Sequence, residues 1–305
     1  MKKIISILLV LSLSLLALVA CGGGNQGGNE TPAEKSYTLV VVVDSAVNAT
    51  SNKVSNTALA LVIDADNKIV AARFDSAEAT PVLDENGALV AVESVATKVE
   101  QGDEYKGMDA GSWEKQTKAF EDAIVGKTAD EVANLDASLV SGCTMLSTPA
   151  TFKALVAEAF SSGLKVTFKT SEPITLGLAV STAVKAGRGG SVGVSSDFAG
   201  VVMAGGKVVA AMLDSCEQSF TIEEGAIVAG TLAASKNEQG DNYKMDAGSW
   251  ASQAQVYANF AVGKTVAELN NLDTVSDALA NAGCTMQNTT GGYKATIIKA
   301  AGYAR

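Results

Sequence analysis

A long internal duplication constrains this chain more than any other feature of its sequence. The stretch EQGDEYKGMDAGSW at residues 100–113 recurs as EQGDNYKMDAGSW at residues 238–250, with one residue deleted and one changed. A repeat of about 140 residues corresponds to a whole domain rather than to one turn of a solenoid. Further segments match in the same order, namely 68–72 with 207–211, 125–128 with 262–265, 134–136 with 271–273, and 142–145 with 283–286.

Each copy starts with segments that are typical of strands. These segments are rich in β-branched residues or alternate in polarity, and turn residues separate them, Asp66-Asn67 in the first copy and Gly205-Gly206 in the second. The predicted strands cover residues 37–44, 58–65 and 68–75 in the first copy, and 198–204 and 207–214 in the second.

Helices are predicted after the strands. Ser112 and Ser249 are good N-cap residues, and Trp113 and Trp250 fall on the apolar faces of the helices that follow, so both tryptophans are predicted core residues. Capping boxes at 128–131 and 265–268 open a short second helix, and a closing helix follows at about 148–160 and 292–301. The sequence therefore predicts an α+β fold with two tandem copies of a small antiparallel sheet with helices packed on it, over residues 36–163 and 164–305.

The N-terminus has the features of an export signal. Residues 1–20 combine two lysines with a long apolar run that ends in Leu-Val-Ala, directly before Cys21. This ending resembles a bacterial lipobox, which implies cleavage before Cys21 and a lipid on its thiol. A transmembrane anchor is the alternative, because the apolar run approaches the length that spans a bilayer. Residues 21–35 then form a Gly-rich flexible tether. We therefore expect an exported protein that is lipid-anchored to the outside of the bacterial cytoplasmic membrane or envelope.

The composition excludes several chemistries. The chain has 33 acidic residues, 23 basic residues and no histidine. Without histidine there is no Ser/His/Asp or Cys/His triad and no ordinary catalytic zinc site, and no metal ligand set is predicted. A net charge of −10 disfavours nucleic acid as a partner. We expect a redox carrier or a binding protein rather than a turnover enzyme.

The most informative motif lies before the closing helix of each copy. It reads Ser141-Gly142-Cys143-Thr144 in the first copy and Ala282-Gly283-Cys284-Thr285 in the second. A threonine hydroxyl just ahead of a helix N-terminus lies where backbone N–H groups and the helix dipole favour an anion. A phosphate ester on Thr144 or Thr285 would be stabilised there without a nearby arginine.

With its strands, its Gln-containing helix and this motif, each copy resembles the FMN-binding domain of respiratory flavoprotein subunits and of bacterial extracellular electron-transfer lipoproteins. In that family a Ser-Gly-Ala-Thr motif carries FMN through a phosphoester to the threonine, attached by a flavin transferase. The resemblance implies that Thr144 and Thr285 are FMN acceptors, that Ser141, Gly142, Cys143, Ala282, Gly283 and Cys284 form the two loops, and that the protein carries electrons to or from a redox partner in the envelope.

The motif departs from the family at Cys143, Cys284 and Ala282, which replace two alanines and a serine. These departures favour an alternative function, a flavin-free surface lipoprotein that binds a small ligand or an envelope protein. Once Cys21 is lipidated, Cys143, Cys216 and Cys284 remain. The duplicated pair forms a disulfide, two buried thiols, or soft metal ligands together with Met145 and Met286.

Overall fold

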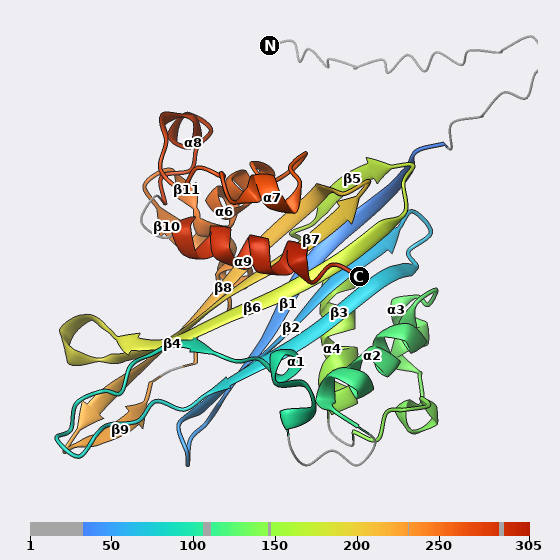
Figure 1. Ribbon diagram of the computed structural model, residues 1–305. Helices are drawn as coiled ribbons and strands as arrows, with labels where there is room; N and C mark the ends of the chain where they lie inside the picture. The colour runs from blue at the N-terminus through green and yellow to red at the C-terminus, as the bar shows by residue number, and fades with distance from the viewer. Residues whose placement is uncertain (1–32, 106–110, 146–147, 231, 287–289) are drawn as a thin grey trace, which may run out of the picture. The chain divides into compact units, whose positions relative to one another are not determined.

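The computed structural model describes residues 33–105, 111–145, 148–230, 232–286 and 290–305 (Figure 1). The predicted signal peptide, Cys21 and nearly all of the predicted tether lie outside the described residues. Residues 33–305 form one compact unit of antiparallel sheets and helices, so the predicted α+β class is confirmed. Among the described helices, none is both long enough and apolar enough to cross a membrane.

Two antiparallel sheets form the centre of this unit. The first has the order β3-β2-β1-β5, and the second has the order β4-β6-β7-β8-β9. In the first sheet the strands are β1 (Lys35–Asn48), β2 (Lys53–Asp64), β3 (Ile69–Ala79) and β5 (Val166–Thr170). In the second they are β4 (Val92–Val95), β6 (Ile174–Ala186), β7 (Val192–Ala204), β8 (Lys207–Glu223) and β9 (Ala226–Ala229).

The predicted hairpin turns are present. Asn67 has a φ of 57° between β2 and β3, and Gly205 and Gly206 have φ values of 55° and 76° between β7 and β8. These left-handed conformations suit Asn and Gly, and they match the twist of two adjacent antiparallel strands.

The two sheets pack face to face, and alternation along the strands decides which side chains meet. Leu39, Val41 and Val43 of β1 lie in the core shared with Leu178, Val202 and Met212 of the second sheet, whereas Val40 and Val42 point to the opposite face. The sheets approach so closely at Gly200 that a Cβ there would lie 2.6 Å from Val41 Cγ2. Because both faces are buried, β1 contains the unbroken apolar run from Leu39 to Val43.

Helices cover the outer faces of both sheets. After β3 come α1 (Lys98–Gln101), α2 (Trp113–Ile124), α3 (Ala129–Ala133) and α4 (Thr148–Ser161), with 3₁₀ turns η1 (Gly102–Glu104) and η2 (Ala137–Leu139). After β9 come α5 (Lys236–Gln239), η4 (Gly240–Asn242), α6 (Trp250–Asn259), α7 (Val266–Leu269), α8 (Asp277–Asn281) and α9 (Thr290–Gly302). A short hairpin of β10 (Lys244–Met245) and β11 (Gly248–Ser249) precedes α6, and a 3₁₀ turn η3 (Arg188–Gly190) links β6 to β7.

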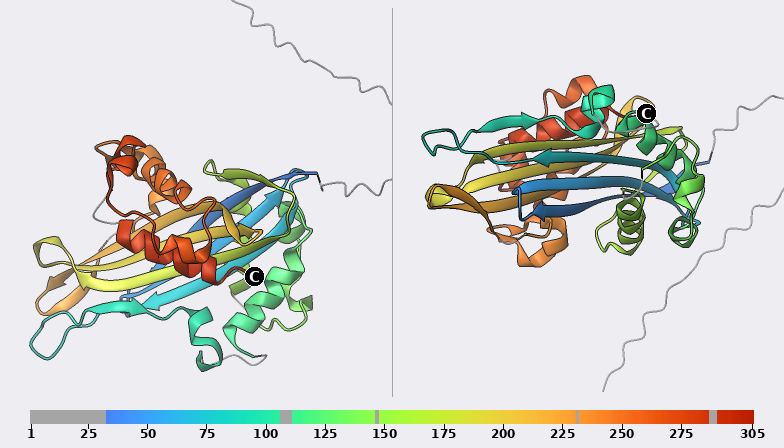
Figure 2. Two further views of the ribbon diagram at one scale, coloured as in Figure 1. Left: turned by 45° about the horizontal axis from the view of Figure 1, so that its top comes forward. Right: turned by 90° about the horizontal axis from the view of Figure 1, so that it is seen from below.

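Each helical layer has its own core. The apolar faces of α2 and α4 pack on the outward side chains of β1, β2 and β3, and those of α6 and α9 pack on β6, β7 and β8 (Figure 2). Trp113 and Trp250 are buried in these two cores, as predicted. The predicted N-caps and capping boxes are also present, since the Ser112, Ser249, Thr128 and Thr265 side chains accept bonds from the backbone N–H three residues ahead.

The two halves of the chain exchange elements. β4, from the first half, extends the second sheet beside β6, whereas β5, from the start of the second half, extends the first sheet beside β1. The C-terminal ends of the closing helices, α4 and α9, also contact the opposite half of the chain. Lys299 of α9 bonds to Glu100 of α1, and Glu158 of α4 lies near Glu238 of α5. Each closing helix therefore ends against the first helix of the other half.

Candidate functional site

Thr144 is an exposed residue that hydrogen-bonds to a buried glutamine, Gln116. Thr144 is exposed, and both its backbone N–H and its Oγ1 donate to Oε1 of Gln116, at 2.7 and 3.1 Å. Gln116 is fully buried on α2, and its Nε2 donates to the carbonyl of Gly111 at 3.2 Å. Because the hydroxyl proton points to the glutamine, Oγ1 keeps its two lone pairs as acceptors.

Thr285 lies in the same setting in the second half. Its backbone N–H and Oγ1 donate to Oε1 of Gln253 on α6, at 2.8 and 2.9 Å, and Thr285 is also exposed. Gln253 is fully buried, but its Nε2 has no hydrogen-bond partner. A β10–β11 hairpin precedes this helix, and within the described residues no bond joins Gln253 to Gly248. The second glutamine is therefore anchored at one end only.

The remaining predicted site residues divide into surface and core positions. Ser141, Gly142 and Ala282 are exposed, whereas Cys143 and Cys284 are buried. Gly142 and Gly283 have φ values of 81° and 97°, so glycine is needed for the turn itself. The connections from the threonines to α4 and α9, residues 146–147 and 287–289, lie outside the described residues. The predicted anion site at the helix N-termini lies there.

The cysteines behave as buried thiols. Cys143, Cys216 and Cys284 are all free, so no disulfide joins the duplicated pair. Burial raises the pKa of Cys216 to about 12 and also raises that of Cys284, so both stay protonated. Over the described part of the chain, no group of three Cys, Asp or Glu side chains is arranged to hold a metal ion.

The repeated Tyr and Trp residues hold a lysine in each half. Lys98 Nζ lies 5.1 Å from the ring centre of Tyr105 and 5.8 Å from that of Trp113. The second half repeats the arrangement with Lys236, Tyr243 and Trp250, at 5.1 and 5.4 Å. Glu78 and Glu217 pair with the two lysines at 2.8 and 2.7 Å. These cation–π contacts give the duplicated stretch a structural role that the sequence pattern left open.

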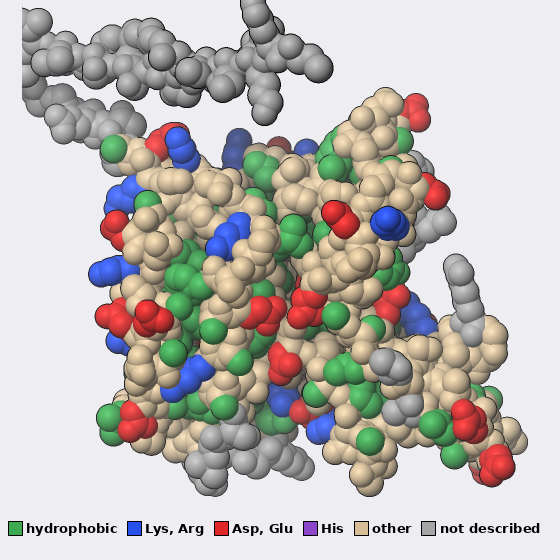
Figure 3. Space-filling model, turned by 180° about the vertical axis from the view of Figure 1, so that it is seen from behind, with side chains coloured by type: hydrophobic (Ala, Val, Ile, Leu, Met, Phe, Trp, Pro, Cys, Tyr) green, Lys and Arg blue, Asp and Glu red, His purple; other side chains and the backbone are tan. Residues whose placement is uncertain are grey.

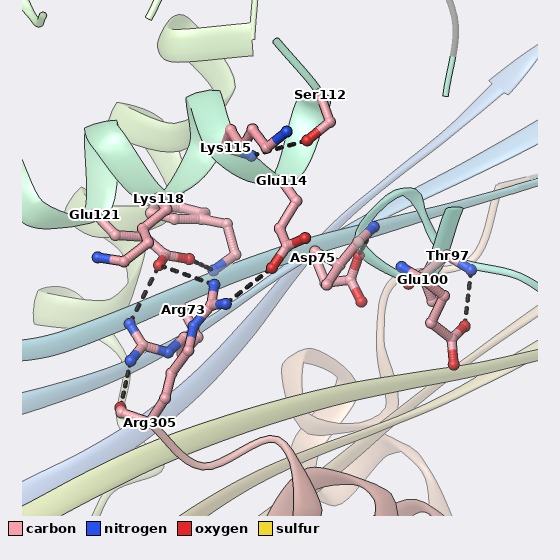
Figure 4. Close-up of polar contacts among 12 residues, drawn as sticks. Arg73, Asp75, Thr97, Glu100, Ser112, Glu114, Lys115, Lys118, Glu121 and Arg305 are labelled. Atoms are coloured by element: carbon pink, nitrogen blue, oxygen red, sulfur yellow. Dashed lines mark hydrogen bonds and ion pairs between the residues drawn. The ribbon is translucent and has the colours of Figure 1, made fainter. Parts of the chain in front are cut away.

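A cavity of about 380 Å³ lies where the end of α9 meets the first half. At one side of this first cavity, Arg73 pairs with Glu121 at 3.1 Å and Arg305 pairs with Glu114 at 2.8 Å. At the other side lie Asp75 and Glu100 (Figure 4). Asp75 is buried on β3, and burial raises its pKa to about 7, although Thr97 and two backbone N–H groups bond to it.

A second cavity, of about 340 Å³, lies at the matching place in the other half, where the end of α4 meets α5. Its lining includes Glu158, Asp214 and Glu238 and no basic side chain. Glu158 of α4 aligns with Lys299 of α9, which pairs with Glu100 beside the first cavity. One half therefore places a lysine beside the capping-box glutamate, and the other half places a glutamate there. Over the face seen from behind in Figure 3, acidic and basic side chains are otherwise interspersed.

The proximity of Glu158 to Glu238 predicts that the free energy of unfolding falls as the pH rises. Burial, together with Glu238 and Asp44, raises the pKa of Glu158 to about 7, and burial raises that of Asp214 to about 7. A raised carboxyl pKa means that the folded state holds the proton to higher pH than the unfolded state, so stability declines between about pH 4 and pH 7. Thermal unfolding across this range should show the decline. Glu158→Gln should reduce the slope, and an unchanged slope would contradict the assignment of the effect to Glu158.

The comparisons with known proteins add no assignment. No family model, no curated protein and no solved structure matches this chain. Function is therefore inferred from the surroundings of Thr144 and Thr285 and from the two cavities. No local sequence pattern indicates the cavities, because each combines residues from both halves of the chain.

Proposed function

We propose that the protein is a cell-surface electron carrier that holds FMN on Thr144 and Thr285. The observation that supports this is the repeated arrangement of an exposed threonine whose hydroxyl and N–H are both fixed by a buried glutamine. The flavin, when attached, supplies the redox chemistry, and the protein fixes its position and environment.

The residues fit the attachment of a phosphate ester. Both threonines are exposed, so a transferase can reach them. Each Oγ1 would attack the FMN phosphorus of a flavin dinucleotide, and the Oγ1–P bond would form as the P–O bond of the pyrophosphate breaks. The nucleoside monophosphate would leave, and the hydroxyl proton would pass to solvent. The glutamine still receives the threonine N–H after this step, because its Oε1 accepts both groups. In the second half, the unpaired Nε2 of Gln253 and the unpaired hydroxyl of Tyr257 leave two buried donors near the acceptor loop.

The two sites belong to different helical layers. Gln116 is on α2, which packs on the first sheet, and Gln253 is on α6, which packs on the second. Two flavins would therefore contact different partners rather than each other, and their environments would differ. We also propose that export and a lipid on Cys21 place this carrier at the membrane surface, where a redox partner in the envelope exchanges electrons with it.

The visible absorption spectrum tests this function. The full chain, coexpressed with a flavin transferase and extracted in detergent, should be yellow and should bleach on reduction with dithionite. The colour should persist after denaturation and gel filtration, because the bond is covalent. A colourless protein would contradict the proposal and leave the alternative of a flavin-free binding lipoprotein.

A further inference from the structure

The charges around the first cavity are not required by the fold. Arg73 and Glu121 form a largely buried ion pair, with side-chain exposures of 16% and 2%. Alignment of the two halves places Met212 and Ala258 at these positions, and both are buried in apolar surroundings. A buried ion pair is often no more stabilising than apolar residues of similar volume. The pair therefore calls for a functional explanation.

The same contrast holds for the other charged groups of this cavity. Glu114 and Arg305, which pair with each other, match Ala251 and Leu164. Among the charged residues that line the two cavities, two have a counterpart in the other cavity. They are the buried aspartate (Asp75 and Asp214) and the capping-box glutamate (Glu100 and Glu238). Four additional charges therefore lie at the junction between α2 and the end of α9, three from the first half and Arg305 from the second.

The cavity lining presents charged groups that are partly open to a ligand. Arg305 and Glu114, which pair with each other, have side-chain exposures of 42% and 33%. Arg73 Nε is buried and has no partner, although the other guanidinium nitrogens donate to Ala72, Glu121 and Arg305. Glu114 and Asp75 present carboxylates beside it, as Figure 4 shows. Phe74, Val99 and Leu178 supply apolar surface to the same cavity. A buried donor without a partner is costly, which is a further sign that the Arg73–Glu121 pair does not serve stability alone.

We propose that the first cavity binds a small zwitterion, a free α-amino acid, with its carboxylate on Arg73 and Arg305 and its ammonium between Asp75 and Glu114. The lining carries both signs of charge, so a ligand of either single charge would meet like charge on one side. A cavity of about 380 Å³ lies within the range of small-molecule sites. This inference does not depend on flavin binding.

The second cavity is an internal negative control. It has the matching aspartate, Asp214, and the matching capping-box glutamate, Glu238, but its lining has no arginine or lysine to receive a carboxylate. Glu158 adds a further negative charge. A zwitterion should therefore bind to the first cavity only.

The test is isothermal titration calorimetry of the full chain in detergent with each standard amino acid in turn. We expect saturable binding of at least one of them. Arg73→Met combined with Glu121→Ala installs the residues of the second half, so it should fold and should weaken binding by at least about tenfold. Glu114→Ala, which matches Ala251, should also weaken binding and does not disturb the buried pair. Glu158→Gln, in the second cavity, should leave binding unchanged.

Three results would overturn the proposal. The first is that no amino acid binds saturably to the unchanged protein. The second is that binding survives both the Arg73→Met/Glu121→Ala variant and the Glu114→Ala variant. The third is that acetate or methylamine, each with one charge, binds as tightly as the best amino acid, because the site would then not recognise a zwitterion.

Discussion

Changing both Thr144 and Thr285 to alanine is expected to abolish flavin attachment completely while the fold stays intact. The phosphoester needs the threonine oxygen, so the loss should be all-or-none rather than partial. The backbone N–H of each residue would still donate to Gln116 or Gln253, so the buried amides keep one of their two bonds there. Intact mass of the variant after coexpression with a flavin transferase should equal that of the unmodified chain.

Single variants resolve the two sites. Thr144→Ala and Thr285→Ala should each remove one FMN mass, and Thr→Ser at the same positions should retain it, because serine keeps the hydroxyl. A flavin mass that persists in the double alanine variant would show that another residue carries the group. Circular dichroism that matches the unchanged protein would confirm that the loss is chemical and not a failure to fold.

Phe152→Ala is expected to produce the largest loss of stability among single core substitutions in the first half. Phe152 is fully buried on α4, and its ring centre lies 4.0 Å from that of Phe74, 5.4 Å from that of Phe120 and 6.0 Å from that of Trp113. Removing the ring leaves a cavity at the centre of these three aromatic neighbours. The expected cost is about 3–5 kcal/mol in the free energy of unfolding.

Urea unfolding measures this effect, with Leu139→Ala as the matched control. Leu139 is 80% exposed in η2, so its truncation should change the free energy of unfolding by less than about 0.5 kcal/mol. If both variants unfolded at the same urea concentration, the aromatic cluster would not be a stabilising core. The helical layer of the first half would then owe its stability to other contacts.

Local patterns predicted many of the elements well. The capping boxes, the hairpin turn at Asp66-Asn67 and the buried Trp113 and Trp250 follow from residue chemistry over a few positions, and the structure confirms them. The sequence pattern does not predict strand β6, because Gly177 and the mixed polarity of this segment obscure the strand signal. Gly177 is required because a Cβ there would clash with the backbone of Ala300 in α9.

Long-range pairing could not be predicted in the same way. The exchange of β4 and β5 between the sheets depends on the stacking of two halves, and no local pattern records which edge a short strand will join. For the candidate site, the sequence indicated the two threonines but not Gln116 and Gln253. Their repetition at matching positions of α2 and α6 was visible, but only the fold brings them under the threonines.

The cavities were missed for the same reason. Asp75 and Asp214 are repeated in the sequence, but nothing local indicates that α9 and α4 end beside them. Lys299 and Glu158 occupy matching positions of the two closing helices. Only the structure shows that each lies beside the capping-box glutamate of the other half. A sequence repeat is therefore most informative when residues that differ between the two copies are compared at matching positions of the structure.

The most direct test of the central claim is the intact mass of the full chain after coexpression with a flavin transferase. We expect a mass gain of two FMN groups relative to the chain expressed alone, mapped by peptide analysis to Thr144 and Thr285. An unchanged mass in the presence of an active transferase, verified on a known acceptor, would contradict the proposed flavin carrier.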